Sequence, residues 1–410
     1  MQLPKQGVKW DTLDGQMDAA RAGDVDWRDG RIGVYIHYAG DDVLQVAKNA
    51  YLKFFSENGL GPKAFPSLAK FEREVVSMTL ALLNAPAQAA GSMTTGGTES
   101  IFLAVKAARD WARTVRPEVS SPEIVAPRSA HPAFDKAAHF LGLRVRRVPV
   151  ADGFGADPVA MEAAIGSNTI MLIGSAPAYP YGVMDPIPQL GAIAVRAGLW
   201  LHVDACVGGF IAPFARKLGV AMPDFDFSVP GVRSISADLH KYGYAAKGAS
   251  TVLYRDSASF AFQPYEFDDW PRGKYATQTL VGTRAGGAIA AAWAVMNFLG
   301  EEGYLDVTRR VLAIRQAIEN GVSALGFEVW GRPQLSIVAY GSPEDDIAAI
   351  ANHLADRSWF VGQIVEPPGI HLMLNLTHEP AVGRYLADLE SARTAARQGR
   401  RSTKQVGATY

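Results

Sequence analysis

Short apolar segments alternate with helical segments from Gly91 onward, and this alternation constrains the fold more than any other feature of the sequence. A helix between two strands returns the chain to the same end of the sheet, so the alternation is typical of parallel α/β units. We therefore predict an α/β fold with a mostly parallel central sheet. The candidate strands are residues 123–126, 144–148, 169–174, 199–204, 232–237 and 250–255.

Proline, glycine and small polar residues mark the ends of the helices around these strands. Asp157 is expected to cap a helix whose first residue is Pro158, and Gly198 is expected to end the helix that starts near residue 188. Ser67 is the predicted N-cap of an earlier helix, in which apolar residues recur at helical spacing.

The length of 410 residues is enough for two or three domains. We predict an N-terminal arm over residues 1–60, a large α/β domain over residues 61–290 and a small C-terminal α+β domain with a tail over residues 291–410. The small domain is expected to follow a long helix over residues 285–299, and it begins with an amphipathic helix over residues 304–325.

The composition excludes several partners and compartments. The net charge is −1, which predicts no nucleic-acid partner, and the single cysteine, Cys206, excludes an intramolecular disulfide. The N-terminus lacks the apolar core of a signal peptide, and the longest run of small apolar residues, 285–300, is too short to span a bilayer comfortably. We therefore expect a cytoplasmic protein with no transmembrane segment, and we predict no metal ligands.

Lys241 is the candidate reactive residue. The strand predicted over residues 232–237 delivers it into a glycine-rich turn that small residues keep close to a bulky group. A lysine forms a Schiff base with an aldehyde when burial or a cationic neighbour lowers its pKa, and Lys247 is the expected neighbour. Most lysines are simply solvated, so this interpretation depends on further motifs.

The first such motif is Thr-Thr-Gly-Gly-Thr-Glu-Ser over residues 94–100, which directly precedes a helical segment. Gly96, Gly97 and Thr98 would present backbone N–H groups and a hydroxyl to an anion at the helix N-terminus. The motif lacks the lysine and the spacing of a P-loop, which disfavours a nucleoside triphosphate. A phosphate group of another kind is the predicted ligand.

The second motif is the apolar strand over residues 199–204, which ends in Asp204. A carboxylate at the carboxyl end of a parallel strand faces the crevice where such sheets bind ligands, and a buried carboxylate needs a cationic partner. His202 should point to the opposite face and is interpreted as a core histidine. His131 follows another predicted strand and is a candidate for stacking on a ring.

These motifs together supply a phosphate cradle, an acid for a protonated ring nitrogen and an amine for an aldehyde. Pyridoxal 5′-phosphate carries those three groups, and the combination is more specific than any one motif. Asp204 would keep the ring nitrogen protonated, so that the ring can accept electrons from a breaking bond. We therefore predict pyridoxal 5′-phosphate as the cofactor.

At these residues the chain resembles the group II pyridoxal-phosphate decarboxylase superfamily, and within it the sphingosine-1-phosphate lyases. The resemblance extends from about residue 38 to the last residues. It rests on the motifs at residues 94–100, 123–131, 202–210, 234–248, 274–277, 282–287 and 367–371.

The resemblance implies fold type I, a homodimer with active sites shared between subunits, and roles for individual residues. It assigns Lys241 to the Schiff base, Asp204 to the pyridine nitrogen and His131 to ring stacking. Phosphate contacts are implied for Gly97, Thr98 and His240, and for Thr283 of the other subunit. Contacts with the polar head of the substrate are implied for Tyr38, Lys247 and Tyr275, the last from the neighbouring chain.

Two departures from the family bear on function. The membrane-spanning N-terminal segment of eukaryotic lyases is missing here, so the resemblance implies a prokaryote-type member. The relatives also have an Asn-Pro-Leu-His-Pro motif, which here reads Asn-Gly-Leu-Gly-Pro over residues 58–62. Gly61 thus replaces a histidine expected to bind the substrate phosphate, and Lys247 and Tyr38 are candidates to compensate.

The function implied is cleavage of the C2–C3 bond of a phosphorylated long-chain amino alcohol by retro-aldol chemistry, giving a long-chain aldehyde and phosphoethanolamine. Decarboxylation of an L-amino acid is the alternative within the same family, because it uses the same electron sink. A cofactor-binding protein without turnover and a nucleotide-binding module are alternatives from other classes. The second of these predicts no visible absorbance and no lysine that borohydride traps.

Overall fold

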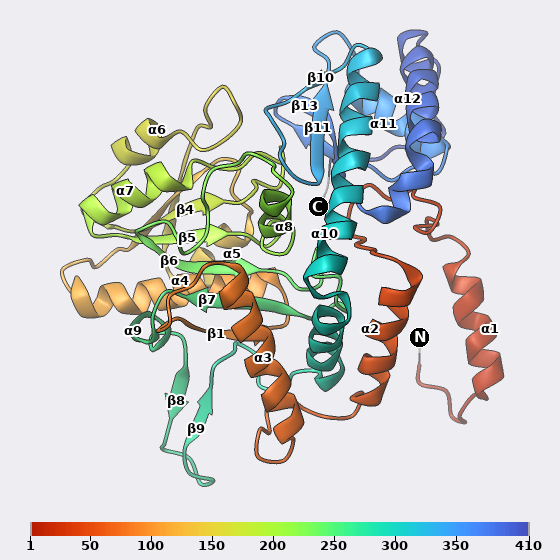
Figure 1. Ribbon diagram of the computed structural model, residues 1–410. Coiled ribbons are helices and arrows are strands. Elements are labelled where there is room, and N and C mark those ends of the chain that lie inside the picture. Colours follow the sequence, from red (N-terminus) through yellow and green to blue (C-terminus); the bar gives the residue numbers. More distant parts are fainter. Residues whose placement is uncertain (1, 409–410) are drawn as a thin grey trace.

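A computed structural model gives the structure of the protein, and it describes residues 2–408. Its centre is a seven-stranded sheet in the order β1-β7-β6-β5-β4-β2-β3 (Figure 1). The strands are β1 (Ala90–Thr94), β2 (Glu123–Pro127), β3 (Arg144–Val148), β4 (Thr169–Ser175), β5 (Trp200–Asp204), β6 (Val232–Ala237) and β7 (Ser250–Tyr254).

The predicted mostly parallel sheet is confirmed, with one strand reversed. β3, β2, β4, β5 and β6 pair in parallel, whereas β7 runs antiparallel to both β6 and β1. Residues 238–249 between β6 and β7 form a turn without a helix, so the chain reverses direction instead of crossing over. This turn carries Lys241.

Both faces of the sheet are covered, which explains why its strands are continuously apolar. Alternate residues of β2 separate onto the two faces: Ile124 lies in one buried cluster and Val125 in the other. α4 (Gly97–Val115) and α5 (Ala133–Leu141) cover the first face, and α7 (Ile187–Ala197) and α8 (Ala212–Lys217) contribute to the second (Figure 1).

The expected helix ends are partly confirmed. The carboxylate of Asp157 accepts hydrogen bonds from the backbone N–H groups of Val159 and Ala160 and caps α6 (Pro158–Ala163), while Gly198 follows the end of α7 in a left-handed conformation. The predicted N-cap Ser67 is wrong. The N-cap position of α3 (Pro66–Leu82) is Phe65, two residues earlier, because proline is suited to the first helical position.

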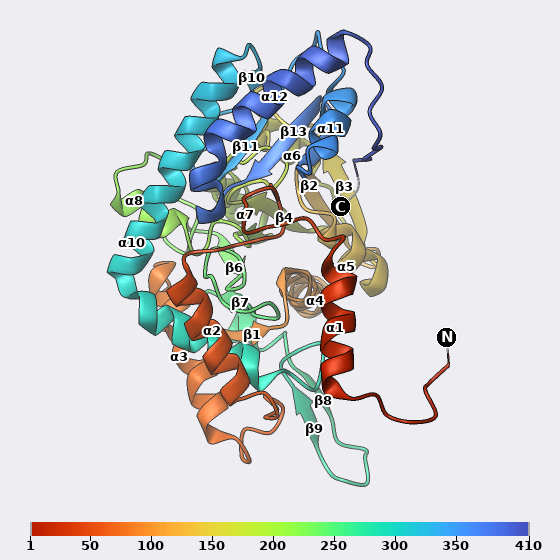
Figure 2. The same cartoon turned by 90° about the vertical axis from the view of Figure 1, so that its right-hand side faces the viewer.

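The two helices predicted around residue 300 form one long element, α10 (Gly286–Ala324), with an interruption at Gly300. Gly300 has φ of +53°, a conformation that glycine adopts readily. α2 (Asp41–Lys53) and α3 pack against α10 (Figures 1 and 2). Val43 and Ala47 of α2 are buried, so this part of the predicted arm joins the core.

A second sheet lies beside the C-terminal half of α10 (Figure 1). It has the antiparallel order β10-β11-β13-β12, with α11 (Ile347–Asp356) and α12 (Val382–Arg397) packed together beside it. The domain boundaries themselves stay a prediction. The strands of this sheet are β10 (Glu328–Val329), β11 (Ile337–Gly341), β12 (Gly362–Val365) and β13 (Pro368–Met373).

Several elements had no counterpart in the sequence-based expectations. They are α1 (Trp10–Arg21), α9 (Ser257–Phe260), the hairpin of β8 (Tyr265–Phe267) and β9 (Tyr275–Thr277), and the 3₁₀ helix η1 (Leu376–Ala381). The hairpin projects away from the central sheet (Figure 1). Within residues 2–408, none of the helices has both the length and the apolar character needed to cross a bilayer.

Gly208, just after β5, should be intolerant of a side chain. A Cβ there would overlap the backbone carbonyl oxygen of Ala176. Relieving such an overlap by backbone movement costs roughly 1–3 kcal/mol, so Gly208→Ala should lower the midpoint of thermal unfolding by about 1–3 °C in a chain of this length. Gly166→Ala is the control, because no atom lies within 4 Å of its added Cβ. Equal midpoints for both variants would contradict the prediction.

Candidate active site

The sequence-predicted residues meet in a cavity of about 360 Å³, here called the cofactor cavity. It lies where β2, β5 and β6 end and where α4 begins. Parallel strands bring their carboxyl ends to the same edge, which is why motifs far apart in sequence converge there. The predicted residues that line it are Gly96, Gly97, Thr98, His131, Asp204, His240 and Lys241.

Lys241 is bound to a carboxylate that the sequence analysis missed. Its Nζ lies 2.9 Å from Oδ2 of the buried Asp238, three residues earlier in the same turn. Burial by itself lowers the pKa of Lys241, but the charge of Asp238 outweighs it, so the pKa is raised above the ordinary value. The expected lowering is therefore wrong for this state. The sequence Asp-Leu-His-Lys contained the signal, an acid in reach of the lysine.

Lys247 is not the partner that sets the charge of Lys241. Its Nζ donates hydrogen bonds to the backbone carbonyls of Tyr35 (3.0 Å) and His240 (3.3 Å). Desolvation by the surrounding protein, and then the positive charge of Lys241, lower the pKa of Lys247 to about 8. The repulsion between the two positive charges therefore lowers the pKa of Lys247 and not that of Lys241.

Asp204 lies at the end of β5, almost fully buried, and opposite Ser236 of β6. Its Oδ1 accepts hydrogen bonds from the backbone N–H of Cys206 (3.0 Å) and from the hydroxyl of Ser236 (3.2 Å). Both donors are neutral, so they fix the carboxylate without cancelling its charge. The predicted cationic partner is thus not among these contacts, and a protonated ring nitrogen would supply it.

His131 follows β2 and faces the same cavity. Its Nδ1 accepts a hydrogen bond from the backbone N–H of Ala133 (3.1 Å), which holds the ring at the start of α5. Burial lowers the pKa of His131, although the charge of Asp204 opposes this. A neutral, fixed imidazole is suited to lie against an aromatic ring, and that role stays a prediction.

His202 is confirmed as a core histidine. It is fully buried, and its two ring nitrogens lie 2.8 Å and 3.2 Å from the hydroxyl oxygens of Ser234 and Ser236. Burial lowers its pKa to about 4, so the ring is neutral near pH 7.

At the start of α4, Gly97 leaves no room for a side chain, whereas a Cβ on Gly96 would make only an ordinary contact. A Cβ on Gly97 would lie 2.8 Å from Oδ2 of Asp238 and 2.9 Å from Sγ of Cys206, and a Cβ on Gly96 would lie 3.8 Å from the ring of His240. The first turn of the helix is therefore open to a ligand through its backbone N–H groups. His240 is held in place because its Nδ1 donates to the carbonyl of Ala249 (2.7 Å).

Glu99 fixes the shape of this turn, a role that sequence reasoning missed. Its Oε2 accepts hydrogen bonds from the backbone N–H and the hydroxyl of Thr95, both at 2.6 Å. Its Oε1 accepts a hydrogen bond from the backbone N–H of Leu280 (2.8 Å). The carboxylate therefore connects the cradle to the segment that precedes Thr283.

Four predicted residues do not line the cofactor cavity within the described part of this single chain: Tyr38, Lys247, Tyr275 and Thr283. The ring of Tyr38 packs at 5.8 Å on Trp27, and Tyr275 lies on the projecting hairpin, 6.2 Å from the ring of Trp270. Thr283 accepts a hydrogen bond from Asn58 (3.2 Å). Tyr275 and Thr283 are expected to act from a second subunit, which one chain does not contain, and the roles of all four residues stay predictions.

Tyr179 is a further lining residue that the sequence analysis missed. It follows β4, the strand between those that carry His131 and Asp204. Its ring lies 6.2 Å from the ring of His131, nearly perpendicular to it. Its position after a predicted strand was the available signal, the same one that identified His131 and Asp204.

The residues present fit pyridoxal 5′-phosphate. The glycine turn and His240 would hold its phosphate, Asp204 its ring nitrogen and Lys241 its aldehyde, and His131 would cover its ring. An independent feature supports the fit: Oδ1 of Asp238 is buried at this cavity and has no hydrogen-bond partner among the described residues. A bound group would be able to satisfy it.

Comparisons with known proteins agree with this fit. Residues 2–341 match the pyridoxal-dependent decarboxylase conserved domain. The chain is 40% identical to a sphingosine-1-phosphate lyase of Oryza sativa, over 95% of this chain and 74% of that one. A structure of a Burkholderia pseudomallei sphingosine-1-phosphate lyase superposes with a TM-score of 0.93 at 35% identity, covering 97% and 94% of the two chains. A probable L-tyrosine/L-aspartate decarboxylase of Methanothermobacter thermautotrophicus is 35% identical over 85% of this chain and 94% of that one.

Proposed function

The chain belongs to the pyridoxal-dependent decarboxylase family, and we propose that it cleaves the C2–C3 bond of a phosphorylated long-chain amino alcohol such as sphingosine-1-phosphate. The products are a long-chain aldehyde and phosphoethanolamine. The observation that carries the proposal is the similarity to lyases of this kind along nearly the whole chain. The cofactor is pyridoxal 5′-phosphate, and the enzyme is a lyase.

When bound, the cofactor supplies an aldehyde for the substrate amine and a ring that accepts electrons from the breaking bond. Lys241, which lines the cavity, would hold that aldehyde. Asp204 holds a proton on the ring nitrogen, and its rigid hydrogen bonds to Cys206 and Ser236 keep the charge in place. His131 covers the ring and excludes water from that side.

Asp238 acts on the amine of Lys241 in this proposal. A protonated amine is not a nucleophile, so Nζ has to lose a proton before it attacks an aldehyde. Oδ2 of Asp238, at 2.9 Å, holds the protonated Nζ in place beside the cavity, and the proton has to leave Nζ when the cofactor binds. With substrate and cofactor bound, Nζ of Lys241 would be one candidate for the group that takes the proton of the C3 hydroxyl. The substrate phosphate is the other.

The specificity for a phosphate head is assigned to Lys247 and Tyr38 and, in a homodimer, to Tyr275 of the neighbouring subunit. Thr283 would join the cofactor phosphate from the same side. The backbone at Gly61 does not explain the missing histidine, because a Cβ there would meet its neighbours only at 3.7 Å or more. A cytoplasmic location is part of this proposal.

Decarboxylation of an amino acid is the second candidate, and the likeness to a probable decarboxylase supports it. That reaction requires a site that orients a carboxylate for departure instead of one that binds a phosphate. Lys247, a cation in the same turn as Lys241, favours the phosphate.

The charge of Lys247 gives a prediction about pH. With a pKa of about 8, Lys247 is positive below pH 8 and becomes neutral as the pH rises through that value. If it binds the substrate phosphate, kcat/KM should fall by roughly tenfold between pH 7 and pH 9.5, mainly through KM. Lys247→Arg keeps its charge throughout this range and should remove most of that fall. The same decline in both proteins would contradict the assignment.

The proposed reaction is tested by trapping the aldehyde. The purified enzyme, loaded with pyridoxal 5′-phosphate, is incubated with sphingosine-1-phosphate and the reaction is stopped before a hydrazine dye is added. The coloured hydrazone of the long-chain aldehyde is then separated from that of the cofactor and measured. We expect hydrazone to accumulate with the phosphorylated lipid and not with sphingosine. Accumulation with neither would contradict the proposal.

A further inference from the structure

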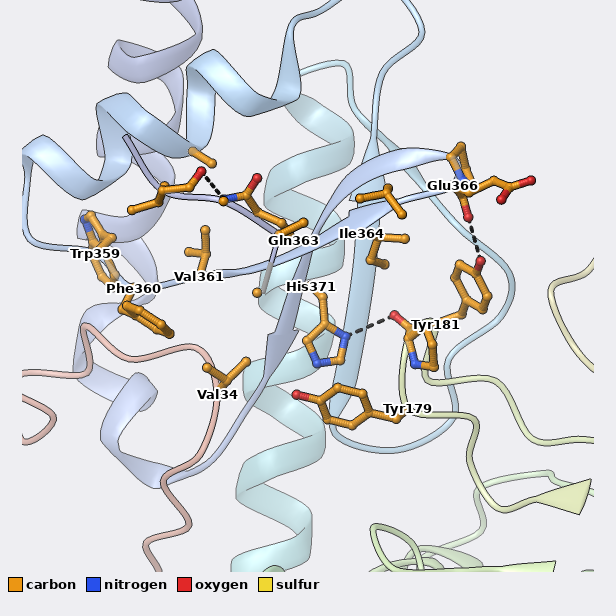
Figure 3. Close-up of a pocket in the computed structure, with 18 of the residues that line it drawn as sticks. Val34, Tyr179, Tyr181, Trp359, Phe360, Val361, Gln363, Ile364, Glu366 and His371 are labelled. Carbon is orange, nitrogen blue, oxygen red and sulfur yellow. Dashed lines mark hydrogen bonds between the residues drawn. The ribbon is translucent and has the colours of Figure 1, made fainter. Parts of the chain in front are cut away.

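A second and larger cavity, of about 840 Å³, adjoins the cofactor cavity. It lies between β12, β13 and the segments that precede α2 and α6 (Figure 3). Tyr179 lines both cavities, so they meet at this residue. The larger one is here called the chain cavity.

Apolar side chains dominate the wall of the chain cavity. They come from segments distant in sequence, and Figure 3 shows Val34, Trp359, Val361 and Ile364. Phe154 is a further apolar residue of this wall. Its volume is within the range of roughly 300–1,000 Å³ that small-molecule sites have. A wall of this kind favours a hydrocarbon group, because transfer of apolar surface out of water drives binding.

Several polar side chains also line this wall, among them Arg128, Gln363, Glu366 and His371. His371 of β13 is buried, and its Nδ1 lies 3.0 Å from the backbone carbonyl oxygen of Pro180. A carbonyl oxygen only accepts, so Nδ1 carries the proton. Burial lowers the pKa of His371 to about 4, so the ring is neutral and Nε2 is left as an acceptor.

That acceptor has no partner. Nε2 of His371 is buried and makes no hydrogen bond with the described residues. The ring lies 4.6 Å from that of Tyr179 (Figure 3), which places the acceptor at the end of the chain cavity nearest the cofactor. An unsatisfied buried acceptor is costly, and a ligand with a hydroxyl group would satisfy it.

We propose that the chain cavity binds the hydrocarbon chain of the substrate, and that Nε2 of His371 accepts a hydrogen bond from a hydroxyl group near the head of that chain. This inference rests on the proposed function, since the chain is attached to the amino alcohol that reacts at Lys241. It also explains why the substrate has a long hydrocarbon chain. That hydrocarbon chain passes Tyr179 and ends among the apolar side chains of the chain cavity.

The first test compares substrates of two lengths. Ile364, partly exposed on β12, is replaced by tryptophan to fill the cavity, and Val159→Trp on the exposed surface of α6 is the control. We expect Ile364→Trp to raise KM at least about tenfold for an 18-carbon amino alcohol phosphate and less than twofold for a 6-carbon one, because each buried methylene strengthens binding by up to roughly fourfold. An equal effect on both substrates, or none, would overturn the proposal.

The second test does not require turnover and so separates this inference from the proposed function. Dodecyl phosphate and 3-hydroxydodecyl phosphate, which lack the reacting amine, are titrated into the cofactor-loaded enzyme by calorimetry. We expect the hydroxylated probe to bind roughly three- to tenfold more tightly. His371→Asn, whose amide N–H keeps a donor near the position of Nδ1, should abolish that preference.

The outcomes are distinct. Binding of both probes with no aldehyde from any lipid would contradict the proposed function and leave the chain cavity supported. Aldehyde production with no effect of Ile364→Trp on probe binding would overturn the chain cavity. An unchanged preference for the hydroxylated probe in His371→Asn would overturn the role of Nε2.

Discussion

Replacement of Lys241 by alanine should abolish aldehyde production, with a loss of at least about 10⁴-fold in kcat, since removal of a covalent group from a catalytic unit has effects of this order or larger. The variant lacks the amine that holds the cofactor and the group that Asp238 serves. It should also lose the product that borohydride traps between the lysine and the cofactor. The measurement is initial rate at saturating cofactor, with borohydride trapping followed by mass spectrometry of the peptide.

Two controls make this result specific. Lys217→Ala removes an exposed lysine whose Nζ pairs with Glu301 at 2.7 Å, and it should leave the rate unchanged. A thermal melt should show that Lys241→Ala remains folded, because its side chain points into a cavity. A variant that retains a tenth of the wild-type rate would disprove the assignment of Lys241.

Asp204→Asn should have the second-largest effect, a loss of about 10²–10³-fold in kcat, which is typical when one preorganised electrostatic group is removed. The amide has nearly the same shape, and its Oδ1 still accepts from the backbone N–H of Cys206 and the hydroxyl of Ser236. The charge that holds the proton on the ring nitrogen is gone, so the ring accepts electrons less well.

The same substitution at another position controls for the loss of charge alone. Asp157→Asn changes the N-cap of α6, where asparagine serves as well as aspartate, and should not affect the rate. Cofactor binding, measured from the visible absorbance, separates a loss of affinity from a loss of rate. Full activity of Asp204→Asn with bound cofactor would contradict the electron-sink mechanism.

Local sequence patterns predicted the parts of the fold that local forces determine. β3 and β6 have the predicted bounds, and Asp157 caps its helix, because strand alternation and capping depend on neighbouring residues. β1 was not identified as a strand, since Ala90–Thr94 contains small and polar residues that become a strand only by pairing with β7. The reversed direction of β7 likewise depends on pairing partners.

The candidate site was also predicted only where local sequence patterns determine it. Lys241, Asp204 and His131 were found because each follows a strand, and the parallel sheet brings strand ends together. The charge state of Lys241 was not predicted correctly. The sequence suggested Lys247 as its neighbour, whereas the turn places Oδ2 of Asp238 2.9 Å from Nζ of Lys241. The chain cavity depends on contacts between segments distant in sequence, such as those carrying Val34 and Val361, and no local pattern encodes it.

The most direct test of the central claim is the identity and stoichiometry of both products. The cofactor-loaded enzyme is incubated in one vessel with sphingosine-1-phosphate and a mixture of the amino acids, and the products are quantified by mass spectrometry. We predict equal amounts of long-chain aldehyde and phosphoethanolamine, with the amino acids unchanged and no reaction by Lys241→Ala. Carbon dioxide and an amine, with the lipid unchanged, would contradict the account and identify an amino-acid decarboxylase.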